Sequence, residues 1–346
     1  MPRPNDERYI RAALNEARRA LGMTSPNPAV GAVLVVGDKI VARGHHSKAG
    51  APHAEVECLS ALKKKVPRNA TLYVTLEPCS TVGRTPPCID EIIRSGVKNV
   101  VIGAVDVNPR HSGRGITFLR EAGINVRAGV LAEECAALNE AFNKWIVTGL
   151  PFVIAKCGMS LDGRLTRPPG ESQWITNAAA RRHARALRAE VDAILVGAET
   201  VRMDNPRLTV RGASGKKQPL RVILSRSGSL PKHAKVFIDR FAKQTRVYRN
   251  QPLDAVLKDL GQKNITSVLI EGGGEILGQA LDSQLIDKLQ IYIGPIFTGG
   301  PVLAFPGRGA AVSQEATRVA HPIYGKIGNS VCVTGYPIYP SRTGVE

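Results

Sequence analysis

The sequence lacks several features that mark specialised classes of protein. Its 346 residues contain no apolar run of the roughly 20 residues that a membrane span requires. The segment that starts at Met1 has no apolar core of the kind that secretion signals carry. Six cysteines are too few for a disulfide scaffold in a chain of this length. These absences predict a globular protein of the reducing cytoplasm, without a membrane partner, in which clustered cysteines bind metal or catalyse.

Aromatic and acidic residues are also scarce. Aromatic side chains make up 5% of the chain, which is sparse for a protein that stacks single-stranded bases. Lys and Arg outnumber Asp and Glu by 47 to 29, which gives a net charge of +18. The net charge is +6 over residues 1–148 and +12 over residues 149–346. A positive surface indicates an anionic partner, either nucleic acid or a small phosphorylated ligand, although solubility alone can also explain it.

The length predicts two domains, and the pattern along the chain agrees. Strand-like and helix-like segments alternate, which is typical of layered α/β domains with much parallel pairing. Thr148-Gly149-Leu150-Pro151 is the best boundary, so we expect domains at 1–148 and 149–346. In the first domain we expect helices over 6–21, 53–65, 88–94, 115–122 and 132–145, and strands over 29–36, 39–43, 71–76, 99–104 and 126–129. In the second we expect a helix over 177–188 and strands over 152–157, 193–196, 221–224, 245–248, 267–270, 288–293 and 330–335.

Two motifs in the first domain indicate a catalytic zinc site. His53-Ala54-Glu55 opens a predicted helix, and Cys79 and Cys88 follow a predicted strand. One His and two Cys are three ligands, the number that leaves a fourth zinc position for water. Zinc lowers the pKa of that water toward neutrality, so that hydroxide can attack a ring carbon. Glu55 lies two positions from His53, where it can accept the proton of the water and pass it to a leaving amine.

The spacing departs from the usual signature of zinc deaminases, His-x-Glu with Pro-Cys-x-x-Cys. Eight residues rather than two separate Cys79 from Cys88. Either half of the pattern alone would favour an ordinary buried His or buried Cys, whereas together they favour a metal site. A purely structural zinc module is the alternative, but structural sites usually have four protein ligands and no fourth is evident.

The long insert between the cysteines closely resembles the deaminase half of the bifunctional riboflavin-biosynthesis deaminase/reductase family (RibD or RibG). Other matching segments are Pro26-Asn27-Pro28, Pro52-His53-Ala54-Glu55, and Asp106-Val107-Asn108-Pro109 followed by Gly113-Arg114-Gly115. The resemblance implies a cytidine-deaminase-like layered α/β domain. It also implies that Asn27 and His46 contact a pyrimidine, and that Arg84, Asp106 and Asn108 lie on its ribosyl phosphate side. Many relatives carry His where this chain has Thr81.

The second domain contains no Gly-x-Gly-x-x-Gly after a strand, so a Rossmann site is not indicated. A predicted strand instead runs into Glu271-Gly272-Gly273-Gly274, a turn that lets main-chain amides approach a phosphate at a helix N-terminus. This turn and the segments around Lys156, Trp174, Leu187-Arg188 and Asp204-Asn205-Pro206 resemble the reductase half of the same family.

That resemblance implies a dihydrofolate-reductase-like α/β domain that binds NADPH. The residues it assigns to the cofactor are Gly158, Trp174, Thr200, Asp204, Gly273, Gly274, Glu275, Ile276, Leu277, Gly278 and Gln279. Those it assigns to the substrate are Ser172, Arg188, Leu208, Arg211 and Glu271, with the arginines on its phosphate. Lys156 can be structural or functional. Ser225-Arg226 stands where relatives often have Asp-Ser or Asp-Thr, and we hypothesise that Arg226 pairs with the 2′-phosphate of NADPH.

We therefore expect a bifunctional, homo-oligomeric enzyme of riboflavin synthesis that uses Zn²⁺ and NADPH on a small phosphorylated pyrimidine. The alternative is a tRNA or DNA base deaminase with an appended nucleic-acid-binding domain. That alternative predicts the larger charge in the deaminase half, stacking aromatic residues and the short Pro-Cys-x-x-Cys. The sequence has none of these three features.

Overall fold

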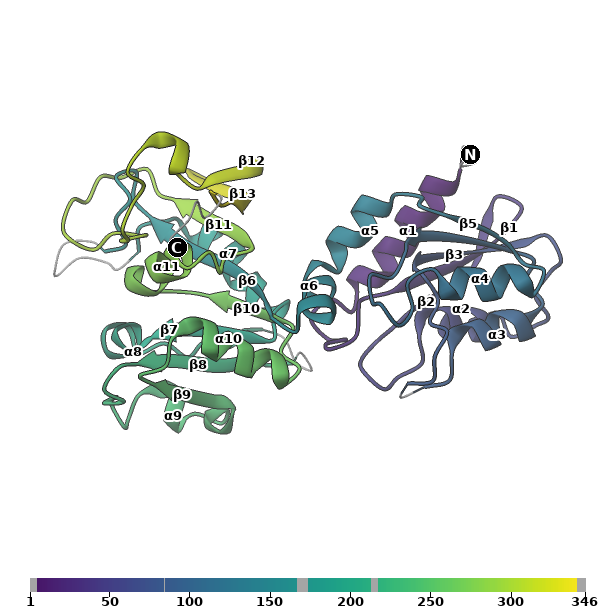
Figure 1. Cartoon of the computed structure of the whole chain (residues 1–346), viewed down its shortest axis with the longest axis horizontal. Coiled ribbons are helices and arrows are strands. Elements are labelled where there is room, and N and C mark those ends of the chain that lie inside the picture. Colours follow the sequence, from purple (N-terminus) through teal and green to yellow (C-terminus); the bar gives the residue numbers. More distant parts are fainter. Residues whose placement is uncertain (1–4, 84, 167–173, 213–216, 341–346) are drawn as a thin grey trace, which may run out of the picture. The chain divides into compact units, whose positions relative to one another are not determined.

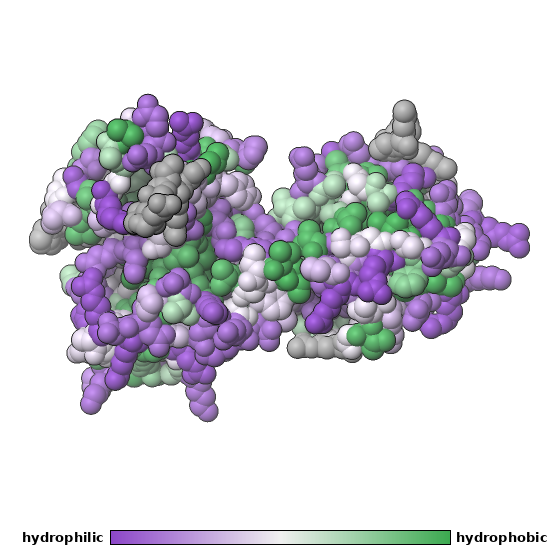
Figure 2. Space-filling model, in the orientation of Figure 1, coloured by the Kyte–Doolittle hydropathy of each residue, from purple (hydrophilic) through white to green (hydrophobic). Residues whose placement is uncertain are grey.

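The computed structural model describes residues 5–83, 85–166, 174–212 and 217–340. The chain divides into two compact units at the bond between Gly149 and Leu150 (Figure 1). Each unit has one sheet with helices packed on it, as expected for α/β layers. Hydrophilic side chains cover most of the visible face of each unit, and hydrophobic ones form smaller patches (Figure 2). Among the described residues, no helix combines the length and apolar character that crossing a membrane requires.

The first unit is built on a five-stranded sheet in the order β2-β1-β3-β4-β5. β1 pairs antiparallel with β2 and β3, whereas β3, β4 and β5 are parallel. Because the parallel strands end at one edge of the sheet, the loops that follow β3 and β4 meet there. The strands are β1 (Gly31–Val36), β2 (Lys39–His45), β3 (Ala70–Leu76), β4 (Asn99–Ala104) and β5 (Asn125–Ala128).

Helices cover both faces of this sheet. One hydrophobic cluster joins the sheet to α2 (Ala54–Ala61), α3 (Cys88–Ser95) and α4 (Arg114–Glu121). A second cluster on the other face joins it to α1 (Asp6–Arg18) and α5 (Ala132–Leu138). The unit ends with α6 (Glu140–Thr148). Both α2 and α3 begin at the sheet edge where the parallel strands end, and this places their N-termini close to each other (Figure 1).

The second unit is built on an eight-stranded sheet in the order β12-β13-β11-β6-β10-β7-β8-β9. The six strands from β11 to β9 are parallel, and β12 and β13 add an antiparallel edge. The strands are β6 (Phe152–Met159), β7 (Ala193–Gly197), β8 (Leu220–Ser225), β9 (Thr245–Arg249), β10 (Ser267–Ile270), β11 (Lys288–Ile293), β12 (Arg318–Ile327) and β13 (Ser330–Ile338).

Helices also pack on both faces of the second sheet. One cluster contains α10 (Leu253–Gln262) and α11 (Gly274–Asp282). The opposite cluster contains α8 (Ala198–Asp204) and the single turn α9 (Lys235–Ile238). A small third cluster joins α7 (Ala178–Ala186) to β11 and β13. Three short 3₁₀ turns complete the described elements, at Leu187–Ala189, Ala242–Gln244 and Ser313–Glu315.

The expected helix over 132–145 is two helices, α5 and α6, which meet at Asn139. The side chain of Asn139 accepts from the amide of Ala29 at 2.8 Å and donates to its carbonyl at 2.9 Å. This buried pairing holds Asn139 in a non-helical conformation (φ −114°, ψ 23°) and so separates the two helices. Strand β12 was not expected, because most of its side chains are exposed and its sequence lacks apolar alternation.

Candidate active sites

Three metal-ligand side chains converge at the edge of the first sheet. His53 is the N-cap of α2, Cys88 is the first residue of α3, and Cys79 follows β3. His53 Nδ1 lies 3.0 Å from Cys88 Sγ and 3.5 Å from Cys79 Sγ, and the two sulfur atoms are 3.5 Å apart. Tetrahedral zinc with bonds of about 2.0–2.3 Å would hold its ligand atoms roughly 3.3–3.8 Å apart, so the group fits zinc. Among the described residues, no fourth His, Cys, Asp or Glu belongs to this group.

The three ligands share protons with one another. A hydrogen bond from Cys88 lowers the pKa of Cys79, although burial opposes this. The same pairing raises the pKa of Cys88, and a hydrogen bond to Cys79 raises the pKa of His53. Because zinc takes thiolates and a neutral imidazole nitrogen, binding of the ion would release the protons of Cys88 and His53.

Glu55 lies beside this group inside the protein. It is 3% exposed, and burial together with the nearby Cys79 raises its pKa to about 7. A carboxylate with such a pKa can both accept and release a proton near neutral pH. The position of Glu55, two residues after His53 on α2, follows directly from the sequence.

His46 and Asn27 form a hydrogen-bonded pair next to the metal ligands. His46 Nδ1 lies 3.0 Å from the carbonyl of Pro52, and Nε2 lies 3.1 Å from the side-chain nitrogen of Asn27. A carbonyl only accepts, so Nδ1 donates and Nε2 accepts from the amide of Asn27. Burial lowers the pKa of His46, which agrees with a neutral ring. His46 therefore orients the Asn27 amide, and its ring packs edge-on to His53 with centroids 5.0 Å apart.

The loop after β4 carries Asp106 and Asn108, and the buried carboxylate of Glu77 holds both ends of it. Glu77 accepts hydrogen bonds from the amides of Asp106, Gly113 and Ile116 at 2.9–3.2 Å. Within the loop, Asp106 Oδ1 accepts from the amide of Asn108 at 2.8 Å. Arg84, which the family resemblance assigns to the same site, lies outside the described residues.

The second candidate site lies where three central parallel strands of the second sheet end. β6, β10 and β7 are neighbours, and they lead to Gly158, Glu271 and the start of α8. Thr200 and Asp204 are on α8, and the Glu271-Gly272-Gly273 turn leads into α11. Gly273 has φ +72°, and a Cβ at Gly274 would lie 2.0 Å from the carbonyl oxygen of Leu303. Glycine at these two positions therefore suits the left-handed backbone at 273 and the close packing of 274 against residue 303.

A charged cluster fills the centre of this site. Arg188 forms a bidentate pair with Glu271, with Nε–Oε1 at 2.6 Å and Nη2–Oε2 at 2.8 Å. Lys156 Nζ lies 3.8 Å from Oε2 of the same carboxylate. Burial alone would raise the pKa of Glu271, but the charges of Lys156 and Arg188 lower it below its usual value. Lys156 therefore faces the site from β6.

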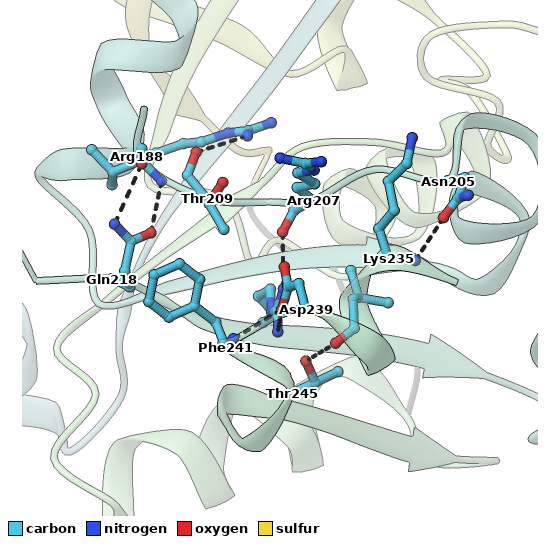
Figure 3. A network of polar contacts seen from close by, with 12 residues as sticks. Arg188, Asn205, Arg207, Thr209, Gln218, Lys235, Asp239, Phe241 and Thr245 are labelled. Atoms are coloured by element: carbon cyan, nitrogen blue, oxygen red, sulfur yellow. Dashed lines mark hydrogen bonds and ion pairs between the residues drawn. The ribbon is translucent and has the colours of Figure 1, made fainter. Parts of the chain in front are cut away.

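The segment 207–211 is held in place by polar contacts (Figure 3). Arg188 Nη1 donates to the carbonyl of Thr209 at 3.2 Å, and Gln218 pairs with the main chain of Val210. The buried guanidinium of Arg221 pairs with Asp239 at 2.8 and 3.0 Å and donates to the carbonyl of Arg207. These contacts position an open cavity of about 480 Å³ whose lining includes Arg207, Arg211 and Arg240.

The remaining predicted residues of this site differ in exposure. The side chain of Leu208 packs in the hydrophobic cluster with Val201 and Ile223, at a positive φ of 51°. Trp174 is exposed, and the guanidinium carbon of Arg181 lies 4.7 Å from its ring centre. Arg226 is also exposed and lies 3.5 Å from Glu275 of the glycine-rich turn. Ser172 lies outside the described residues.

Comparisons with known proteins match both units of the chain. The family model of the cytidine and deoxycytidylate deaminase zinc-binding region matches residues 3–104, and that of the RibD C-terminal domain matches residues 151–326. The riboflavin biosynthesis protein RibD of Aquifex aeolicus is 41% identical over 86% of this chain and 89% of its own length. That of Bacillus amyloliquefaciens is 38% identical over 96% of each chain.

The chain belongs to the RibD family. Solved structures support the same assignment. RibD of Acinetobacter baumannii superimposes with a TM-score of 0.87 at 35% identity, covering 96% of this chain and 99% of its own. A diaminohydroxyphosphoribosylaminopyrimidine deaminase/5-amino-6-(5-phosphoribosylamino)uracil reductase of Thermotoga maritima does so with a TM-score of 0.84 at 34% identity, with the same coverage. Membership confirms a bifunctional deaminase and reductase of riboflavin biosynthesis that uses zinc and NADPH.

Sequence reasoning missed three residues that shape the deaminase site of this RibD family member. Glu77, Asn139 and His111 come from the end of a strand, a helix junction and a loop. Glu77 had a detectable signal, since it is a charged residue between an apolar strand and Pro78-Cys79. Asn139 and His111 had no such signal, because their partners, Ala29 and Thr81, are far away in the sequence.

Proposed function

We propose that residues 1–148 deaminate 2,5-diamino-6-ribosylamino-4(3H)-pyrimidinone 5′-phosphate and that residues 149–346 reduce the ribosyl group of the product. The observation that carries the first step is the convergence of His53, Cys79 and Cys88 beside the buried carboxylate of Glu55. The Thermotoga maritima relative is named for both reactions, and its structure covers almost the whole of this chain.

In the deaminase, His53, Cys79 and Cys88 would hold zinc. A bound zinc ion lowers the pKa of water and makes hydroxide available at neutral pH. Glu55 takes a proton from that water and returns it to the amino group, which leaves as ammonia. Asn27, oriented by His46, binds the pyrimidine edge. Arg84, Asp106 and Asn108 bind the ribosyl phosphate side.

In the reductase, NADPH supplies a hydride to C1′ of the ribosyl group when it is bound. Residues 273–279, at the start of α11, would hold the cofactor together with Gly158, Trp174, Thr200 and Asp204. Ser172, Leu208 and Glu271 bind the substrate, and Arg188 and Arg211 bind its phosphate. Support comes from the pairing of Glu271 with Arg188, which fixes the guanidinium at the strand ends. Lys156, 3.8 Å from Glu271, adds positive charge to the same place.

We also propose a cytoplasmic homodimer or larger assembly with no nucleic-acid or membrane partner. All six cysteines are free thiols, which suits a reducing compartment. The low aromatic content and the larger charge on the reductase half argue against a base deaminase that acts on nucleic acid. A salt-dependent gel shift with RNA would contradict this part of the proposal.

The test is to give purified, zinc-loaded protein the undeaminated pyrimidine phosphate and to follow ammonia and NADPH together. We expect ammonia release followed by NADPH loss in equal amounts. Ammonia without NADPH loss would contradict the proposed reductase step and direct attention to Ser225-Arg226. The absence of both signals would show that the proposed substrate is wrong.

A further inference from the structure

Two buried polar atoms of the deaminase site make no hydrogen bond with any described residue. They are Oγ of Ser80 and Nδ1 of His111. Buried polar groups in folded proteins are nearly always paired, so an unpaired one at an active site calls for a partner such as a water molecule, an ion or a ligand atom. Ser80 directly follows the metal ligand Cys79, whereas His111 comes from the loop after β4.

The fold fixes the position of His111 closely. Its amide donates to the carbonyl of Asn108 at 2.9 Å, and its carbonyl accepts from the amide of Arg114 at 2.7 Å. Glu77 clamps the two ends of this loop, as described above. On the ring, Nε2 lies 3.5 Å from Oγ1 of Thr81. The ring is therefore held on its Nε2 side, and Nδ1 is the nitrogen left for a ligand.

The neighbours of His111 indicate which part of the ligand it meets. Asp106 and Asn108 share its loop, and the proposed function assigns both to the ribosyl phosphate side of the substrate. Burial raises the pKa of Asp106, and the neighbouring His111 opposes that rise, so the two side chains are close to each other. Arg110 and Arg114, on either side of His111, are exposed and add positive charge. An anionic group is thus favoured at this end of the site.

We propose that His111 contacts the substrate, with Nδ1 bonded to an oxygen of its ribosyl phosphate. This inference rests on the proposed deaminase function and adds a substrate-specificity residue to it. Thr81, on the loop after β3, has its hydroxyl oxygen 3.5 Å from Nε2 and supports the ring from that side.

The two ring nitrogens can be tested separately with matched amides. The amide of Asn reaches the position of Nδ1, and the longer Gln reaches that of Nε2. In deaminase assays, His111→Gln and His111→Ala should raise KM about tenfold with kcat within twofold, as loss of one hydrogen bond to a charged group predicts. His111→Asn should keep KM within twofold of the unmodified protein. Equal KM values for all three variants and the unmodified protein would overturn the proposal.

Moving the imidazole from residue 111 to residue 81 gives a second test. The double variant Thr81→His with His111→Ala should recover most of the lost KM, because the imidazole then returns from the other side. A double variant with the same KM as His111→Ala would show that an imidazole on residue 81 does not replace the one on residue 111. Ser112→Ala, at the exposed residue next to His111, is the matched control and should behave as the unmodified protein.

Assays with the dephosphorylated nucleoside distinguish the atoms involved. If Nδ1 bonds to the phosphate, the KM ratio between His111→Ala and the unmodified protein should fall to about one with this substrate. If it bonds to a ribose hydroxyl, the ratio should persist. Zinc content and reductase activity should be unchanged in every variant, which separates a local effect from misfolding. Unmodified protein that releases no ammonia would instead refute the proposed function itself.

Discussion

Each candidate site contains a buried glutamate, Glu55 in the first unit and Glu271 in the second, and their surroundings shift the two pKa values in opposite directions. Glu55 is 3% exposed, and burial, which outweighs the charge of His53, raises its pKa to about 7. The side chain of Glu271 is 7% exposed, but Arg188 and Lys156 lower its pKa below the usual value. Similar burial thus gives one carboxylate that can exchange a proton and one that stays charged.

The opposite pKa shifts of the two glutamates match the different roles of the protein in the two reactions. Deamination needs a group that moves a proton, and such a group works best with a pKa near the working pH. Reduction takes its hydride from NADPH, so the protein contributes orientation and charge. A permanently ionised Glu271 suits that role, since it fixes Arg188 in a bidentate geometry. The substitutions below test this division of roles.

The largest effect is expected from Glu55→Gln. Glutamine keeps the shape of the side chain but cannot accept the proton, so kcat of deamination should fall at least about 10³-fold. Zinc content and reductase turnover of the deaminated substrate should not change, because the metal ligands and the second unit are untouched. Ammonia release at more than about a tenth of the normal rate would remove Glu55 from the proton-transfer role.

Arg188→Met should leave the buried carboxylate of Glu271 without its bidentate partner. Arg188 is 12% exposed, and removing one partner of a buried ion pair typically costs about 3–5 kcal/mol. With Lys156 still 3.8 Å away, we expect the lower end of that range, about 3 kcal/mol, in the free energy of unfolding. Denaturant titration of the reductase unit's unfolding would measure it, and reductase activity should be lost.

The double variant Arg188→Met with Glu271→Leu shows whether stability is lost because a buried charge has no partner or because packing is lost. Since replacing both charges by apolar groups avoids a lone buried charge, most of the lost stability should return while the reductase remains inactive. A double variant as unstable as the single one would show that the lone buried charge is not the cause of the lost stability.

The lowered pKa of Glu271 also predicts how stability depends on pH. The stabilising contribution of this carboxylate is present at neutral pH and is lost as the pH falls through its pKa in the folded protein.

Thr85→Val should weaken zinc binding without removing a ligand. Oγ1 of Thr85 lies 3.3 Å from Nε2 of His53, whose Nδ1 faces the two thiols. Outer partners of this kind orient a metal-binding imidazole, and losing one typically lowers affinity 10- to 100-fold. Competition with a chromogenic chelator would measure the affinity directly. Thr85→Ser keeps the hydroxyl and should bind zinc normally; equal affinities for the two variants would exclude Thr85 as a supporting residue.

The two sites also differ in how far the sequence could predict them. His53, Glu55, Cys79 and Cys88 are specified by local spacing and by the helix and strand beside them, so chemistry alone identified them. The reductase residues are predicted only through the family resemblance, because Arg188 and Glu271 are 83 positions apart and no short motif joins them. His111 was missed for the same reason, since its contact with Thr81 joins two loops that the fold brings together. Glu77 had a local signal, but its clamping of the loop after β4 depends on the fold.

The smallest expected effect concerns the cofactor preference of the second site. Arg226 is 92% exposed and Glu275 is 84% exposed, so the 3.5 Å pair between them holds the guanidinium only weakly. Arg226 can therefore turn to a phosphate bound at the adjacent glycine-rich turn, which is the hypothesis made from the Ser225-Arg226 departure. Arg226→Ala should raise KM for NADPH about fivefold and leave KM for NADH unchanged. Glu275→Gln releases Arg226 from its partner and should shift the preference further toward NADPH. If Arg226→Ala changes both KM values by the same factor, the guanidinium does not recognise the 2′-phosphate, and the preference for NADPH must come from elsewhere in the second unit.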